Sequence, residues 1–150
     1  SMLLNLVAAA NAGKKEQLWG FIKKYAPDAS LKSNPDLDKA VGFAIRYYND
    51  FIKPKKSYRS PNKIEREALK DLRNKLINYK DSIDPEELQS IVFSCGRERF
   101  DQMRDWFKAI YEILLGASQG PRFGGFIALY GVNETILLID NALDGSLGSI

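Results

Sequence analysis

The stretch that decides the fold is "NPDLDKAVGFAIRYYNDFI", residues 34–52. Its apolar side chains recur at steps of three or four, the period of one helix face; they are Leu37, Val41, Ile45, Tyr48 and Ile52. Asn34 followed by Pro35 is typical of a helix start, with a cap residue and then proline at the first helical position. The stretch therefore predicts one long helix over residues 35–52.

The same period continues along the rest of the chain. We expect helices near residues 2–11, 14–25, 35–52, 62–80, 85–98, 100–115, 121–130 and 134–143. Asp84 and Glu87 suit a capped start, Gly116 suits a helix end, and Asn133 is expected to cap the last helix. We find no convincing run of alternating strand residues. The predicted fold is all-α, a compact multi-helix domain of about eight helices that spans residues 1–150.

Composition restricts the possible chemistry. The 150 residues are 45% hydrophobic and 27% charged, as in an ordinary globular domain. Cys95 is the single cysteine, expected to be buried, and histidine is absent. Histidine-dependent triads and Cys/His zinc sites are thereby excluded, so no metal site is expected. A single cysteine cannot form a disulfide within the chain, which favours a cytoplasmic protein. No apolar run reaches the roughly 18 residues of a membrane-spanning helix, so no membrane partner is expected. Ser1 before Met2 is interpreted as an expression remnant on a piece of a longer chain.

Positive charge is concentrated in one segment. Residues 53–66 carry six cations and one acid, a net +5, whereas the remainder of the chain carries −2. Within it, "KPKKS" at 53–57 is similar to the Lys-Met-Ser-Lys-Ser loop of class I aminoacyl-tRNA synthetases. No strand precedes it, and the companion His-Ile-Gly-His motif cannot exist without histidine. The segment is therefore not interpreted as a catalytic lysine loop.

An RNA contact is the alternative interpretation of the basic segment. Pro54 and Pro61 would stiffen the loop, Tyr58 could stack on an unpaired base, and Arg59 could form two hydrogen bonds with a phosphate. The candidate RNA-binding residues here are Lys53, Lys55, Lys56, Tyr58, Arg59, Lys63 and Arg66. A merely solvated loop, with Tyr58 packed beneath it, is the competing interpretation.

A second candidate lies in "GPRFGG", residues 120–125. It lacks the Gly-Lys-Ser/Thr ending of a phosphate-binding P-loop. Pro121 is expected to begin a helix, whose free N–H groups beside Arg122 could bind an anion. The competing interpretation is a tight turn in which Gly124 and Gly125 let helices approach closely. Arg122 is retained as a candidate RNA contact.

The remaining notable side chains are given structural roles. Five aromatic residues on helical periods are predicted to be core rather than base-stacking residues: Trp19, Tyr47, Tyr48, Phe51 and Trp106. Asp101 and Asp105 lie four apart and are expected on one helix face, where surface pairing is favoured over acid–base catalysis.

Several stretches resemble the C-terminal part of class I lysyl-tRNA synthetases. They are "LLNLV" at 3–7, "LWGFIKKYAP" at 18–27, "NPDLDKAVGFAIRYYNDFIKPKKSYRSP" at 34–61, "DWFKAIYEILLGASQGPRFGGFIALYGV" at 105–132 and "ETILLID" at 134–140. The resemblance spans nearly the whole chain and implies the all-helical anticodon-binding domain of that family. It implies tRNA(Lys) and the enzyme's own catalytic domain as partners.

The same resemblance implies that the intact enzyme attaches lysine to tRNA with ATP and Mg²⁺. Both catalytic motifs of the family are absent from the 150 residues, so no catalytic residue and no cofactor is expected in this fragment. A helical module for protein or interdomain contact, without RNA binding, stays open as the other function.

Overall fold

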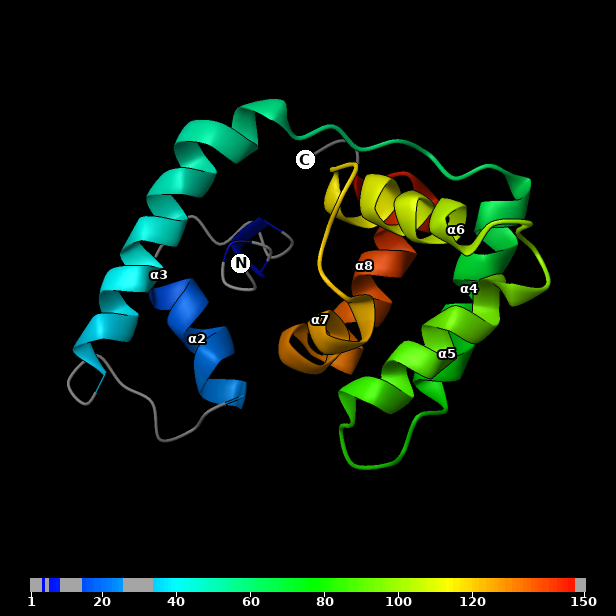
Figure 1. Cartoon of the computed structure of the whole chain (residues 1–150), viewed down its shortest axis with the longest axis horizontal. Helices are drawn as coiled ribbons and strands as arrows, with labels where there is room; N and C mark the ends of the chain where they lie inside the picture. The colour runs from blue at the N-terminus through cyan, green and yellow to red at the C-terminus, as the bar shows by residue number, and fades with distance from the viewer. Residues whose placement is uncertain (1–3, 5, 9–14, 26–33, 148–150) are drawn as a thin grey trace. The chain divides into compact units, whose positions relative to one another are not determined.

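The computed structural model describes residues 4, 6–8, 15–25 and 34–147. Every regular element within these ranges is a helix and none is a strand, which confirms the predicted all-α class. The chain divides into two compact units, Ser1–Lys56 and Ser57–Ile150 (Figure 1). The expected domain of residues 1–150 thus consists of two units, each with its own core.

The first unit contains two packed helices, and the second of them is extended by two short helical turns. Its described elements are α2 (Lys15–Tyr25), α3 (Pro35–Tyr47), the π-helical turn η1 (Tyr48–Ile52) and the 3₁₀ turn η2 (Lys53–Lys55). Residues 4 and 6–8 are helical, and the rest of the expected helix 2–11 lies outside the described residues. The predicted helix over 35–52 is therefore present, but its last turn is π-helical.

Packing of α2 against α3 buries the predicted apolar face. The buried side chains are Leu18, Trp19 and Ile22 from α2, and Val41, Ala44, Ile45 and Tyr48 from α3 and η1. Asp38 of α3 accepts hydrogen bonds from Lys15 Nζ and Trp19 Nε1, both at 3.1 Å. These bonds lower the pKa of Asp38. The polar contacts tie the first turn of α3 to α2 beside the apolar contact (Figure 1).

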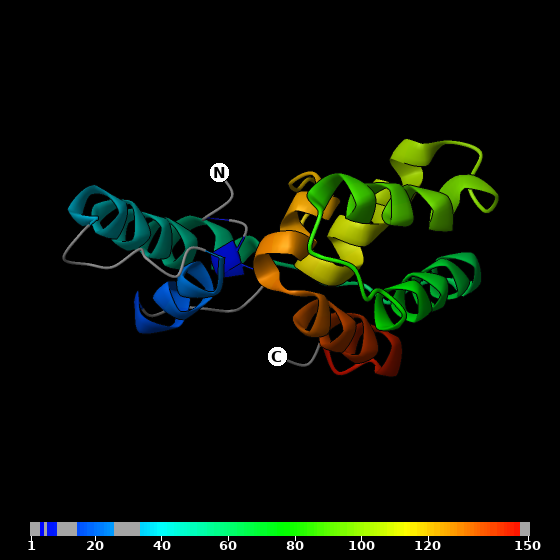
Figure 2. The ribbon, with the colours of Figure 1, turned by 90° about the horizontal axis from the view of Figure 1, so that it is seen from below.

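The second unit contains the remaining elements in one bundle. They are α4 (Lys63–Ile77), α5 (Pro85–Arg97), α6 (Met103–Ile110), the π-helical turn η3 (Tyr111–Leu115), α7 (Phe123–Tyr130) and α8 (Val132–Asp144). Helix α5 packs on α4, α6 and α7, and α8 packs on α4, α7 and η3. Figure 2 shows α4 and α8 side by side.

Trp106 lies at the centre of this core. It has no exposed surface, and its Nε1 donates to the Val92 carbonyl at 2.9 Å. Gly96 makes room for the indole, since an added Cβ would lie 2.3 Å from Trp106 Cδ1. Cys95 is buried as predicted, and burial raises the pKa of its thiol to about 11. The thiol is thus a small apolar core group at neutral pH.

Glycine brings α5 and α7 together. An added Cβ on Gly124 would lie 2.4 Å from the backbone nitrogen of Gln89 and from the Pro85 carbonyl oxygen. The Gly124 N–H donates to Gln89 Oε1 at 2.7 Å. For Gly124 this arrangement matches the close-helix interpretation, and it uses one of the N–H groups that the anion interpretation needed.

Two helix ends agree with the prediction, and the start of α8 does not. Asp84 caps α5 through Glu86 N–H and Glu87 N–H as expected, and Gly116 adopts the left-handed φ of 69°. Helix α8, however, begins at Val132, so Asn133 lies inside it, and Thr135 Oγ1 instead donates to the Gly131 carbonyl.

Two further expectations about helix starts were wrong. Helix α7 begins at Phe123, two residues after Pro121. Helix α6 begins at Met103, so Asp101 is not on a helix face with Asp105. The residues directly before both helices form no regular element.

None of the described helices is by itself long and apolar enough to cross a membrane. Helices α7 and α8 reach the required length and composition only as a pair, and that pair is bent by 110°.

Candidate nucleic-acid interface

The structure separates the basic segment 53–66 into exposed and internally bonded cations. Lys53 and Lys55 lie in the 3₁₀ turn η2, not in a loop, and both are exposed. Lys63 is exposed at the start of α4. None of these three amines forms an ion pair within the described part of the chain, so each can approach a polyanion.

The side chain of Lys56 packs within the first unit. Its Nζ donates to the Ala8 carbonyl and lies 5.7 Å from the centroid of the Tyr48 ring. Burial lowers the pKa of this amine to about 8. The position favours an internal anchor over a phosphate contact.

Arg59 connects two parts of the second unit. Its guanidinium donates to Glu65 Oε1 at 2.7 Å and Oε2 at 2.8 Å, and to Glu112 Oε1 at 2.9 Å. The hydrogen bonds that Arg59 donates to Glu65 raise the pKa of Arg59, and the same bonds lower the pKa of Glu65. Glu65 also closes a capping box with Asn62 at the start of α4. Arg59 thus stabilises the helix start and links it to η3.

Tyr58 and Arg66 also have positions inside the second unit. The hydroxyl oxygen of Tyr58 is buried, and the ring lies beside a small cavity lined by Ile113 and Ala142. Arg66 donates to the Leu143 carbonyl near the end of α8 at 2.9 Å. The position of Tyr58 agrees with the alternative that its side chain packs beneath the segment. Arg66, expected as an RNA contact, is instead bonded within the second unit.

Arg122 remains accessible. Its guanidinium donates to Glu86 at 2.8 Å, and both side chains are well exposed, at 62% and 73%. Such an exposed pair is weak and can be exchanged for another anion.

The aromatic predictions were right for three residues and wrong for two. Trp19, Trp106 and Tyr48 are buried. Tyr47 and Phe51 are 40% and 57% exposed, because the helix pair buries only one face of α3. The periodicity marked both faces of this helix as apolar, and burial is decided by the packing of α2 on one of them.

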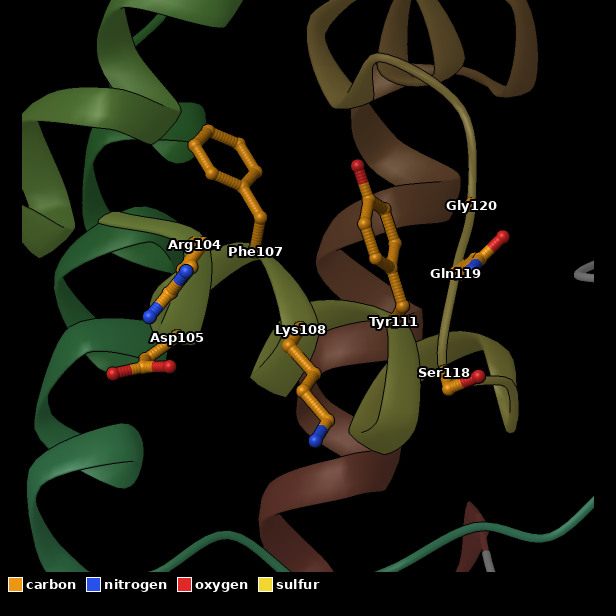
Figure 3. A pocket seen from close by; sticks show the side chains of 8 residues that line it. All are labelled: Arg104, Asp105, Phe107, Lys108, Tyr111, Ser118, Gln119 and Gly120. Atoms are coloured by element: carbon orange, nitrogen blue, oxygen red, sulfur yellow. The ribbon is translucent and has the colours of Figure 1, made fainter. Parts of the chain in front are cut away.

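A groove in the second unit was not predicted. It has a volume of about 740 Å³ and is formed by α6, the start of η3 and residues 118–120. Its walls combine two cations, one acid, two aromatic rings and small polar groups: Arg104, Asp105, Phe107, Lys108, Tyr111, Ser118, Gln119 and Gly120. Figure 3 shows the rings of Phe107 and Tyr111 projecting from the helix, with the extended segment 118–120 beside Tyr111.

The groove wall around Tyr111 is fixed by contacts. The Tyr111 hydroxyl donates to the Pro121 carbonyl at 2.7 Å. Gly120 lies so close that an added Cβ would be 2.6 Å from Tyr111 Cδ1. Burial raises the pKa of the Tyr111 phenol, so it stays a neutral donor. The ring and the segment therefore form one preorganised surface.

These groups suit an unpaired base with its phosphates. Phe107 and Tyr111 offer aromatic surface for stacking. The Gln119 amide can donate to and accept from a base edge. Arg104 and Lys108 are exposed and form no ion pair among the described residues, so they can neutralise phosphates. The sequence did carry a signal, because aromatic and basic residues alternate at 104, 107, 108 and 111 before a glycine-containing turn, but periodicity alone assigns these aromatics to the core.

Curated relatives match the chain over almost its whole length. A lysine–tRNA ligase from Roseobacter denitrificans is 63% identical over 147 residues, which is 98% of this chain. Lysine–tRNA ligases from Rickettsia felis and Rickettsia peacockii are 44% and 45% identical over 144 residues, or 95% of the chain. The chain spans only 27% to 28% of the length of these relatives. No protein-family model matches the chain, and no solved structure matches it significantly.

Proposed function

We propose that this chain is the tRNA-binding portion of a class I lysine–tRNA ligase and contacts the anticodon region of tRNA(Lys). The observation that carries the proposal is the 63% identity with a protein named lysine–tRNA ligase over 98% of the chain. The groove of the second unit supports it, because it presents rings, an amide and unpaired cations on one surface. A single-stranded anticodon loop offers the unstacked bases that such a surface binds.

Each groove residue has a distinct role in this proposal. Phe107 and Tyr111 stack on a base, Gln119 bonds to its edge, and Lys108 and Arg104 neutralise phosphates. Among the residues first identified in the sequence, the exposed Lys53, Lys55, Lys63 and Arg122 are further phosphate contacts. Lys56, Tyr58, Arg59 and Arg66 act by holding their own unit together.

Catalysis would belong to the part of the ligase outside these 150 residues. The intact protein would attach lysine to tRNA(Lys) with ATP and Mg²⁺ in the cytoplasm, and its catalytic domain would be the natural partner of this portion. No group of three or more Cys, Asp or Glu residues suited to a metal occurs in the part of the chain that the structure describes. The purified chain is expected to give no lysine-dependent ATP–pyrophosphate exchange.

The proposal is tested by tRNA binding over a range of salt concentrations. The chain should bind tRNA(Lys) more tightly than an unrelated tRNA. Lys108→Ala should weaken binding and reduce the slope of log affinity against log salt by about 0.7–0.9. Lys70→Ala is the matched control, since Lys70 is an exposed lysine of α4 away from the groove.

Gln119→Ala reports on base recognition in the same assay. It should reduce the preference for tRNA(Lys) and leave the salt slope unchanged, because no charge is removed. Equal affinity for both tRNAs, or equal loss in Lys108→Ala and Lys70→Ala, would contradict the proposal.

A further inference from the structure

A ladder of exposed aromatic side chains runs along the first unit. Phe43, Tyr47 and Phe51 are 63%, 40% and 57% exposed. The ring centroids of Phe43 and Tyr47 are 6.1 Å apart, and those of Tyr47 and Phe51 are 5.0 Å apart. Three large rings in mutual contact on a solvent-facing helix surface are unusual, since contiguous exposed apolar surface generally marks a binding site.

The π-helical turn keeps the ladder straight. In an α-helix, four residues exceed one turn by about 40°, so residues at steps of four drift around the axis. Between Tyr47 and Phe51 the helix changes to the wider π turn η1, which holds more residues per turn and offsets that drift. Lys39 and Lys55 lie four residues before and four residues after the three rings in the sequence, and Lys55 belongs to the 3₁₀ turn η2. The surface is therefore a line of three rings, with one lysine on each side of it in the sequence.

The charges around the ladder favour a polyanion. Exposed cations between residues 39 and 55 are Lys39, Arg46, Lys53 and Lys55, against one acid, Asp50. None of these four cations is ion-paired among the residues that the structure describes. Lysine is depleted at protein–protein interfaces, whereas rings interleaved with cations are the usual surface for single-stranded nucleic acid.

We propose that the ladder of Phe43, Tyr47 and Phe51 binds unpaired bases of single-stranded RNA. The two end rings, whose outer surfaces are the most exposed, stack on bases, and the lysines at the ends contact the adjoining phosphates. The inference rests on the proposed tRNA-binding function and adds a second RNA contact, on the first unit, to the groove of the second.

The test uses substitutions that keep apolar bulk and remove the ring. A fluorescently labelled RNA decamer of alternating A and C, which cannot pair with itself, is titrated with the full chain and with Phe43→Leu and Phe51→Leu. Each Leu variant should bind the decamer about 5- to 150-fold more weakly, with an unchanged salt slope. Phe43→Tyr keeps a ring at the same place and should bind like the parent.

Lysine substitution gives the complementary signature. Lys39→Ala and Lys55→Ala should each lower the salt slope by about 0.7, the value for one contact with a single strand. All variants change exposed side chains, and unchanged circular dichroism and melting temperature confirm that they fold.

Four results would overturn the inference. If the Leu variants bind the decamer like the parent, the rings do not stack on bases. If the parent sediments as a dimer that Phe43→Asp dissociates while decamer binding persists, the ladder is a contact between two copies. If tRNA(Lys) binding depends on Lys108 but not on the ladder, the inference fails and the proposed function stands. If the parent binds no RNA at all, both the inference and the proposed function fail.

Discussion

Replacement of Arg59 by alanine tests whether this side chain stabilises the second unit or binds RNA. The side chain makes three hydrogen bonds to two carboxylates, two of them to Glu65. Glu65 is buried, and without Arg59 its carboxylate would retain only the hydrogen bond donated by the Asn62 N–H. We therefore expect Arg59→Ala to destabilise the second unit even where no RNA is present.

The magnitude follows from the partial burial of the pair. Exposed ion pairs contribute about 0–1 kcal/mol, whereas removing one partner of a buried pair costs about 3–5 kcal/mol. The side chains of Arg59 and Glu65 are 40% and 8% exposed, which places this pair between the two limits. We expect the free energy of unfolding to fall by about 1.5–3 kcal/mol.

Urea denaturation followed by circular dichroism measures this change. Arg122→Ala is the matched control, because it removes an arginine from an exposed pair of the same unit and should cost less than about 0.5 kcal/mol. If the two variants are equally stable, the assigned role of Arg59 is wrong. If Arg59→Ala is as stable as the parent and yet loses tRNA binding, the original interpretation of Arg59 as a phosphate contact is correct.

Acid pH gives a second measure of the same pair. Arg59 lowers the pKa of Glu65 below its ordinary value of 4.5. A carboxyl whose pKa is lowered on folding contributes stability that is fully present above 4.5 and is lost as the pH falls through the folded-state pKa. The stability difference between parent and Arg59→Ala should therefore shrink below pH 4.5, and a constant difference would contradict the pairing.

Four other substitutions test the packing of the two units by urea denaturation. Trp106→Ala should lower the free energy of unfolding by about 3–5 kcal/mol, since it empties a fully buried site; a mutant as stable as the parent would contradict this. Gly124→Ala should cost at least about 1–3 kcal/mol because its Cβ would overlap backbone atoms, whereas Gly20→Ala, with open space around it, should stabilise α2 by about 0.5–1 kcal/mol; equal effects would refute the close approach. The stability of Lys56→Met relative to the parent should be highest at neutral pH and should fall from pH 8 towards 10.5, because the unfolded lysine of the parent binds more protons than the folded one in that window; a difference that does not change with pH would show that Lys56 is not buried.

The helices were predictable because apolar period and caps agree locally. Seven of the expected ranges match the described helices α2 to α8, with η1 and η3 as continuations of α3 and α6, to within about two or three residues at most ends. The π-helical turns η1 and η3 could not be predicted, because a π turn replaces an α turn without changing which residues are apolar. The division after Lys56 could not be predicted either, since it depends on long-range packing.

The candidate site was harder to predict than the fold. Phe107 belongs to an apolar period with Trp106 and Ile110, yet Trp106 is buried and Phe107 lines a groove. That difference arises because residues 118–120 fold back along Tyr111, a tertiary contact that no local pattern encodes. Tyr47 and Tyr48 show the same limit, because adjacent residues of one helix have opposite environments.

The basic segment 53–66 shows that the number of cations in a sequence segment can exceed the number of cations that are free to bind a ligand. Its cations adjoin the place where one unit ends and the next begins. Lys56 bonds to the Ala8 carbonyl in the first unit, and the N–H of the next residue, Ser57, bonds to the Gly116 carbonyl in the second. Arg59 and Arg66 then fix the start of the second unit to η3, α4 and α8.

A cation that already satisfies a carboxylate or a carbonyl must break that bond to meet a phosphate, so its net contribution to RNA affinity is small. The six cations of residues 53–66 therefore divide by function. Three of them hold the chain ends of the two units, and Lys53, Lys55 and Lys63 remain to attract RNA. A salt titration of the three exposed lysines against Lys56, Arg59 and Arg66 would measure that division directly, since only the former group should change the slope.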